Sequence, residues 1–148
     1  MTHPPTDRFP VEKFTLHAGR DCRHVKYDGR LIGVLETLPH RLYQKPRYRV
    51  RFLDTKRSTL FGVDGHDETQ LVDEISTYFK ANVERINETV TEYHQLGEDY
   101  RRVQHEPARA AIEYAVRKTE RELKAPVELI RLVEPDFKLH LSRVTESY

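Results

Sequence analysis

The sequence predicts an α+β protein: an antiparallel sheet of four or five strands in two β-hairpins, then two or three helices and a C-terminal strand. Three observations support this fold class. Residues 47–52 alternate strictly between arginine and apolar side chains, which is the period of a β-strand. Asp28-Gly29 separates two strand-like segments, as in a two-residue hairpin loop. After residue 67, apolar residues recur every three or four positions, as on one face of a helix.

Length and composition favour one domain with a short lead-in. The chain has 148 residues, of which 37% are hydrophobic and 33% are charged, enough for one core beneath a well-solvated surface. We expect residues 1–11, which contain three prolines, to form a flexible lead-in and residues 12–148 to form a single α+β domain.

Charge divides this domain into two parts. Residues 18–57 carry eleven Lys and Arg against four Asp and Glu, a local charge of +7, whereas residues 58–148 carry twelve against eighteen, a local charge of −6. We therefore predict a basic sheet part, residues 12–63, and an acidic, mainly helical part, residues 64–148.

The first hairpin is predicted around Asp28-Gly29, between residues 22–27 and 30–37, with a short strand at 13–17 before it. Both loop residues of a type I′ turn need a positive φ, which Asp and Gly tolerate. The turn would set the following pairs: Tyr27 with Arg30, Val25 with Ile32, and Arg23 with Val34.

The second hairpin is predicted to pair residues 47–53 with residues 58–63. A two- or four-residue loop would place the apolar residues of both strands on one face and the arginines on the other. The expected pairs are Phe52 with Thr59, Val50 with Phe61, Tyr48 with Val63, Arg51 with Leu60, and Arg49 with Gly62.

The first helix is predicted to begin at Asp67, which forms a capping box with Gln70. Gly97 is expected to end it, because glycine is unfavourable inside helices and common at their C-terminal caps; the alternative is one helix of more than thirty residues. Apolar residues from 79 to 93 form a narrow, coiled-coil-like stripe. We therefore also expect homodimerisation through residues 71–103.

A second helix is predicted to start at Glu106-Pro107, since proline suits the first helical position, and to stop at Pro126. The pattern leaves open whether residues 127–133 form a strand or a short helix. Residues 137–144 alternate between apolar and polar side chains and are predicted to form the terminal strand.

The candidate functional site is the arginine face of the 47–52 strand. Three guanidinium groups in one row repel each other, so a face of this kind favours an anionic partner. We predict non-catalytic nucleic-acid binding, with double-stranded DNA preferred, in a regulatory or accessory role. The alternatives are an acidic protein surface and internal pairing with Glu84, Glu88 or Glu92. The predicted contact residues are Arg47, Arg49, Arg51, Lys26, Arg41, Lys45, Lys56 and Arg57.

The pattern of strands, basic sheet positions and a helix over residues 22–80 resembles, in outline, two kinds of DNA-binding domain: phage integrase arms and plant APETALA-type factors. In those domains, the sheet face lies in the major groove and the helix packs on its back. The tryptophan and glycine landmarks of the plant family are not present, so no residue is carried over from the resemblance.

The sequence gives little support for catalysis or for metal binding. We expect no catalytic residue, metal or cofactor. His17 and His140 resemble the histidines of two-histidine phosphoesterases, but only His140 is followed by a hydroxyl two residues later. Cys22 and His24 lack a second ligand pair at zinc-like spacing. Three further residues, Arg101, Arg102 and His105, are interpreted as solvated helix charges.

The number of cysteines and the hydropathy of the sequence indicate the cellular compartment. The single cysteine, Cys22, excludes an internal disulfide framework. No apolar run approaches the roughly 20 residues that span a bilayer. We therefore predict a soluble protein, cytoplasmic or nuclear, without a membrane partner.

Overall fold

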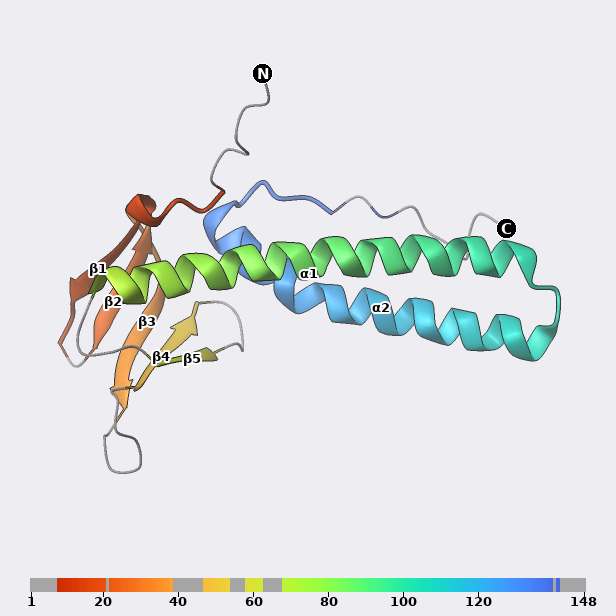
Figure 1. Cartoon of the computed structure of the whole chain (residues 1–148), viewed down its shortest axis with the longest axis horizontal. Helices are drawn as coiled ribbons and strands as arrows, with labels where there is room; N and C mark the ends of the chain where they lie inside the picture. Colours follow the sequence, from red (N-terminus) through yellow and green to blue (C-terminus); the bar gives the residue numbers. More distant parts are fainter. Residues whose placement is uncertain are drawn as a thin grey trace, which may run out of the picture. The chain divides into compact units, whose positions relative to one another are not determined.

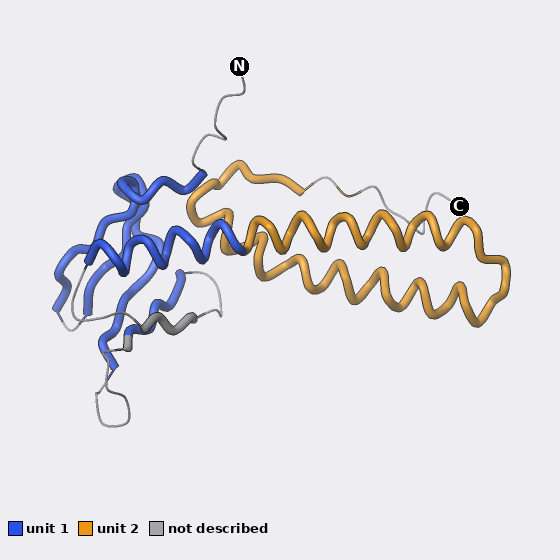
Figure 2. The backbone as a smooth tube through the Cα atoms, in the orientation of Figure 1, with its two compact units in different colours: residues 1–81 blue, residues 82–148 orange. Residues whose placement is uncertain are grey.

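The computed structural model of the chain describes residues 8–20, 22–38, 47–53, 58–62, 68–139 and 141. The chain forms two compact units, residues 1–81 and residues 82–148 (Figure 2). The boundary lies within one long helix, α1 (Glu68–Arg102), which contributes residues to both units.

The first unit contains an antiparallel sheet whose strands follow each other in sequence order, β1-β2-β3-β4-β5 (Figure 1). A single 3-10 turn at Val11–Lys13 precedes it. The strands are β1 (Phe14–Ala18), β2 (Arg23–Tyr27), β3 (Arg30–Leu38), β4 (Arg47–Phe52) and β5 (Ser58–Gly62). With two helices following the sheet, the predicted α+β class is confirmed.

Asp28 and Gly29 join β2 to β3 with φ values of 50° and 82°, the positive values that a type I′ turn requires. Tyr27 pairs with Arg30 as expected. Lys26 pairs with Leu31 in the same register. From Val25 onwards the expected register is wrong by one residue, because Val25 pairs with Gly33 and Arg23 pairs with Leu35.

The cause is a bulge that leaves Ile32 as the extra residue on β3. Ile32 and Leu35 are both buried, each 1% exposed. Strict alternation would place these two side chains on opposite faces, so the bulge allows both to enter the core.

The expected register between β4 and β5 is wrong by two residues. Arg51 pairs with Ser58, Arg49 with Leu60, and Arg47 with Gly62, so the connection is longer than predicted. An even shift leaves every residue of β4 on its expected face, because side chains alternate with a period of two.

The core of the first unit forms between one sheet face and the beginning of α1. Phe79 lies at its centre, with its ring centroid 5.6 Å from those of Phe9 and Phe14 and 5.5 Å from that of Phe52. The hydroxyl of the buried Ser76 donates a hydrogen bond of 2.6 Å to the carbonyl of Phe9, which fixes the chain entering the sheet. The helix therefore covers one face of the sheet, as Figure 1 shows.

Helix α1 does not end at Gly97; it continues to Arg102 and is 35 residues long, as the long-helix alternative predicts. Gly97 is buried inside the helix. A glycine in a helix interior costs about 1 kcal/mol, but at a buried position the absent side chain allows close packing.

Helix α2 (Glu106–Val133) likewise continues through Pro126, so residues 127–133 are helical and the predicted stop is wrong. A proline inside a helix costs about 3 kcal/mol or more. The turns after it bury four apolar side chains, each worth about 1.5–3 kcal/mol, which offsets this cost. These side chains are Val127, Leu129, Ile130 and Val133.

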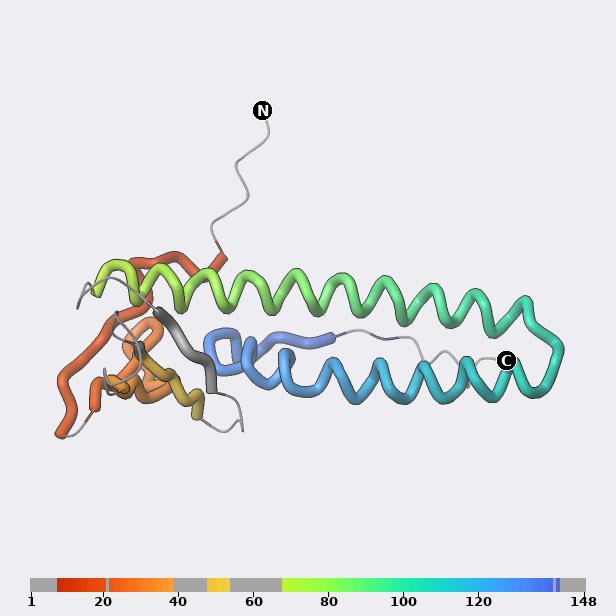
Figure 3. Tube along the Cα trace, turned by 60° about the horizontal axis from the view of Figure 1, so that its bottom comes forward, coloured from red at the N-terminus to blue at the C-terminus, as the bar shows by residue number. Residues whose placement is uncertain are grey.

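The second unit consists of the later part of α1, α2 and the segment that follows. The two helices run antiparallel and side by side, as Figures 1 and 3 both show. The hydroxyl of Tyr93 donates to Glu120 at 3.2 Å, and that of Tyr100 donates to Glu113 at 3.0 Å. Because Tyr93 and Tyr100 lie one heptad apart, these two bonds fix the register of the pair.

The apolar stripe of α1 is divided between the two units: Phe79 lies in the core of the first unit, and Tyr93 is buried in the helix pair. Tyr93 forms a cluster with Val116, against which Leu96 and Ile112 pack. Homodimerisation through residues 71–103 thus gains no support from the packing and stays a prediction.

The predicted terminal strand is not observed: residues 137–139 and 141 lie in no strand, and residues 140 and 142–144 lie outside the described residues. Arg131 donates from Nε to the carbonyl of Phe137 at 3.1 Å, and Leu141 packs on the Tyr93–Val116 cluster. The alternating pattern therefore reflects a segment that lies with one side against the helices.

Candidate nucleic-acid interface

Strand β4 separates arginine from apolar side chains, as its alternation predicts. Tyr48 and Val50 are fully buried and Phe52 is 3% exposed, on the face that packs against α1. Arg49 and Arg51 lie on the opposite face, which we call the outer sheet face. The physical reason is that the apolar residues are removed from water while the guanidinium groups stay solvated.

Neighbouring strands complete the outer sheet face through their register. Glu36 on β3 lies directly opposite Arg49, and Val34 lies opposite Arg51. Strands β1 and β2 continue the row of Arg51 and Val34 through His24 and His17. The described members of this face are Thr15, His17, His24, Lys26, Leu31, Val34, Glu36, Arg49 and Arg51.

The two arginines converge on one carboxylate oxygen. Arg49 Nη2 lies 2.8 Å and Arg51 Nη2 lies 3.3 Å from Oε2 of Glu36. The three side chains are 35%, 58% and 30% exposed, so the cluster is open to solvent. The Nε of Arg49 is itself buried and has no hydrogen-bond partner among the described residues. The cluster carries a net charge of +1 and has the geometry of a small oxyanion site.

The arginines also set the ionisation of Glu36. The hydrogen bond from Arg49 holds the pKa of Glu36 below its usual value of 4.5, against the opposing effect of partial burial, and the charges of Arg51 and Arg49 add to the lowering. Because the folded pKa is the lower one, this ion pair contributes to stability above pH 4.5 and is lost as the pH falls through the depressed pKa.

The structure describes only part of the predicted contact set. Lys26 lies half-buried on the outer sheet face. Arg47 belongs to β4, where its backbone pairs with Leu38 and Gly62, but its side chain is outside the description. The remaining four predicted residues, Arg41, Lys45, Lys56 and Arg57, lie outside the described residues.

The chain matches no protein-family model, no curated protein and no solved structure. The resemblance in outline to integrase-arm and APETALA-type domains therefore stays a prediction, and the function must be argued from the residues of the face themselves.

Internal pairing occurs, but between residues other than those expected. Glu36, not a helix carboxylate, pairs with Arg49 and Arg51, and Arg23 on β2 reaches Glu68 on α1 at 3.3 Å. The expected partners on the helix form no ion pair with any residue in the described part of the chain; they are Glu84, Glu88 and Glu92, all exposed. The local pattern does not reveal Glu36, although it is the only acidic residue between positions 29 and 53.

The described residues do not form the other candidate sites, the two-histidine site and the metal site. His17 lies on β1 with its Nε2 3.0 Å from the hydroxyl of Thr15, and His140 lies outside the described residues. Within the described ranges, no three His, Cys, Asp or Glu side chains lie close enough together to hold a metal ion. Neither described helix is long and apolar enough to cross a membrane.

Proposed function

We propose that the chain is a non-catalytic nucleic-acid-binding protein that holds duplex DNA against the outer sheet face. The observation that carries the proposal is the convergence of Arg49 and Arg51 on a single carboxylate oxygen, on a sheet face that α1 leaves uncovered. Two guanidinium groups that already share one oxyanion can hold a phosphate oxygen by the same charge-assisted hydrogen bonds.

The spacing along β4 suits a repeating anion. Alternate residues on a strand are about 6–7 Å apart, from a rise of roughly 3.3 Å per residue. Arg47, Arg49 and Arg51 would therefore present successive guanidinium groups to neighbouring phosphates, or to base edges in the major groove. Lys26 and the half-buried His24 extend the same face on β2, and Glu36 is its one carboxylate among the described residues.

Titration with a random-sequence DNA duplex tests the proposal. Fluorescence anisotropy of a labelled duplex should show binding at about 50 mM salt and a steep loss at about 200 mM salt, because each neutralised phosphate contributes about −0.9 to the slope of log K against log salt. Absence of binding at the lower salt concentration would contradict the proposal.

An acidic protein surface is the second candidate, because the anion that the arginines hold in the structure is a carboxylate. Polyglutamate and duplex DNA, compared as competitors at equal charge concentration, separate the two functions. Stronger competition by DNA supports nucleic-acid binding, whereas equal or stronger competition by polyglutamate supports the acidic partner.

Glu36 occupies the place that a phosphate oxygen would take, so its neutralisation is expected to strengthen DNA binding. Glu36→Gln should raise duplex affinity about two- to fivefold at low salt, because the phosphate no longer has to displace an exposed ion pair. The measurement is the same anisotropy titration.

Glu88→Gln is the matched control, because it makes the same charge change at an exposed position of α1. An equal gain in both variants would show only a general effect of net charge. A loss of affinity in Glu36→Gln alone would show that the carboxylate is needed to orient the arginines.

A further inference from the structure

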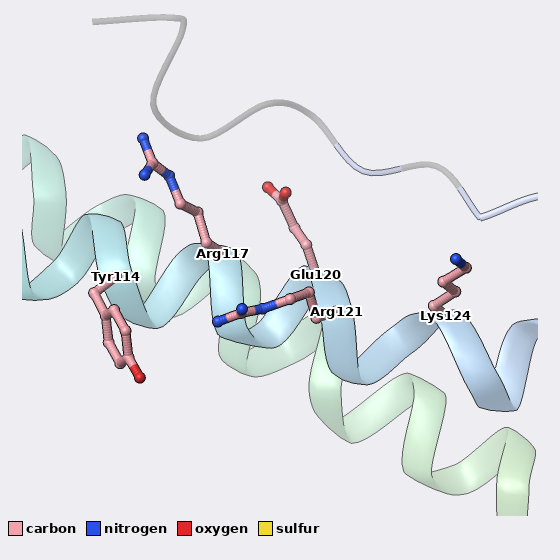
Figure 4. Close-up of a pocket in the computed structure, with 5 residues that line it drawn as sticks. All are labelled: Tyr114, Arg117, Glu120, Arg121 and Lys124. Atoms are coloured by element: carbon pink, nitrogen blue, oxygen red, sulfur yellow. The ribbon is translucent and has the colours of Figure 1, made fainter.

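Helix α2 carries a second basic surface that the outer sheet face does not include. Tyr114, Arg117, Arg121 and Lys124 line a surface pocket of about 540 Å³ together with Glu120 (Figure 4). All five side chains project from one helix of the second unit. The first four, all exposed, are called the α2 stripe below.

The α2 stripe lies on the solvent side of the helix. At 100° per residue its four members fall within an arc of about 80°. The buried residues Val116, Thr119 and Leu123 lie on the opposite side of the helix. From Tyr114 to Lys124 there are ten steps of 1.5 Å, which give the stripe a length of about 15 Å. It is therefore a band of exposed side chains along one side of the helix.

The hydrogen bonds and ion pairs of the neighbouring carboxylates are made with other residues, and three cations outnumber the one carboxylate that lines the pocket. Glu120 accepts a hydrogen bond from Tyr93, and Glu113 accepts one from Tyr100. Glu122 pairs with Lys118 at 4.0 Å. No described residue forms an ion pair with a cation of the stripe. With Glu120 included, the pocket carries a net charge of +2.

Tyr114 adds an aromatic surface to this charge. Its side chain is 66% exposed, whereas the other exposed large hydrophobic residue in the described part of the chain, Leu31, is 42% exposed. An exposed aromatic ring beside three cations is an arrangement that binds single-stranded nucleic acid: bases stack on the ring while the phosphates contact Arg and Lys.

We propose that the α2 stripe binds single-stranded nucleic acid, with an unpaired base stacked on Tyr114 and the backbone phosphates on Arg117, Arg121 and Lys124. A duplex would satisfy the cations, but its stacked bases present no face to Tyr114. An acidic peptide would likewise use the cations and leave the ring without a partner. The proposal rests on the proposed function for its ligand class but uses a separate surface.

The test is titration of the full chain with a labelled single strand of about 15 thymidines and, in parallel, with the duplex. Tyr114→Ala should weaken single-strand binding about 5- to 150-fold, the factor that corresponds to about 1–3 kcal/mol of base stacking, and leave duplex binding unchanged. Tyr114→Phe, which keeps the ring, should bind like the original chain.

The contribution of the stripe's cations is measured separately, by the salt dependence of single-strand binding. Joint replacement of Arg117 and Arg121 with glutamine should reduce the single-strand salt slope by about 1.4, from about 0.7 per phosphate contact. The exposed Arg85 and Lys138 offer the charge-matched control, since the Arg85→Gln/Lys138→Gln variant should leave the slope unchanged. Circular dichroism would check that every variant keeps its helices.

The outcomes separate this inference from the proposed function. Duplex binding without single-strand binding would contradict single-strand binding by the α2 stripe and would still support the proposed function. Single-strand binding that depends on Tyr114, without duplex binding, would support the α2 stripe as a binding site and contradict duplex binding by the outer sheet face. Equal binding by Tyr114→Ala, or stronger competition by polyglutamate than by the single strand, overturns the inference in favour of an acidic peptide.

Discussion

Joint replacement of Arg49 and Arg51 with glutamine is expected to lower duplex DNA affinity about 10- to 100-fold at about 50 mM salt. Both guanidinium groups project from the outer sheet face, and both already bind an oxyanion there. Each lost phosphate contact removes about 0.9 from the salt slope, so the slope should fall by nearly 2. Anisotropy titrations at four or five salt concentrations would measure both quantities.

The matched control replaces two cations away from the sheet. Arg85 on α1 and Lys138 after α2 are both exposed and belong to the second unit. The Arg85→Gln/Lys138→Gln variant makes the same change in net charge but should change duplex affinity far less. If both double variants lose affinity equally, binding follows the total charge of the chain and the outer sheet face has no special role.

Thermal unfolding of the arginine variant separates function from structure. Arg49 and Arg51 are open to solvent, and exposed ion pairs contribute about 0–1 kcal/mol each, so the unfolding temperature should change by only a few degrees. Cooperative unfolding well below the original temperature would show that Glu36 needs the arginines for folding, and that their charge serves the sheet.

The faces of β4 are predictable from sequence because they depend on a local period. Arginine and apolar residues alternate over six positions, and any register of even shift keeps that pattern. This is why the two-residue error at β5 leaves Arg49 and Arg51 on the predicted face. By contrast, the one-residue bulge at Ile32 has no local signal, since it depends on which side chains fill the core around Leu35.

The helix ends are not predictable because local propensity competes with packing. Gly97 and Pro126 both carry the usual signals of a helix end, yet both lie inside helices and are buried. The free energy gained by burying the turns beyond each residue exceeds the local cost of about 1–3 kcal/mol. Only knowledge of which helix faces meet would reveal this balance.

The sequence predicts only part of the candidate site. Alternation identifies its cations, but Glu36 enters through the register between β3 and β4, across the connection from residue 39 to residue 46. The α2 stripe is absent from the prediction for another reason. Its residues do recur at helical spacing, but charged helix positions are usually solvated faces, and only the exposure of Tyr114 distinguishes this one.

Phe79→Ala is expected to destabilise the first unit by about 3–5 kcal/mol, a large fraction of the 5–15 kcal/mol that stabilises a typical domain. The ring is fully buried, and three of its aromatic neighbours come from separate segments: Phe9, Phe14 on β1 and Phe52 on β4. Its removal leaves a cavity where the helix meets the sheet. Urea unfolding followed by circular dichroism would measure the loss.

Tyr114→Ala removes a ring of similar size from an exposed position, so it should cost less than about 0.5 kcal/mol. Equal unfolding midpoints for the two variants would contradict the assigned core. The link to function runs through β4, where Phe52 packs on Phe79 and the adjacent Arg51 faces outward. Since Phe52 and Arg51 lie on the same strand, Phe79→Ala should lose duplex binding as the first unit unfolds. The variant in which Arg49 and Arg51 are replaced should lose duplex binding while it remains folded.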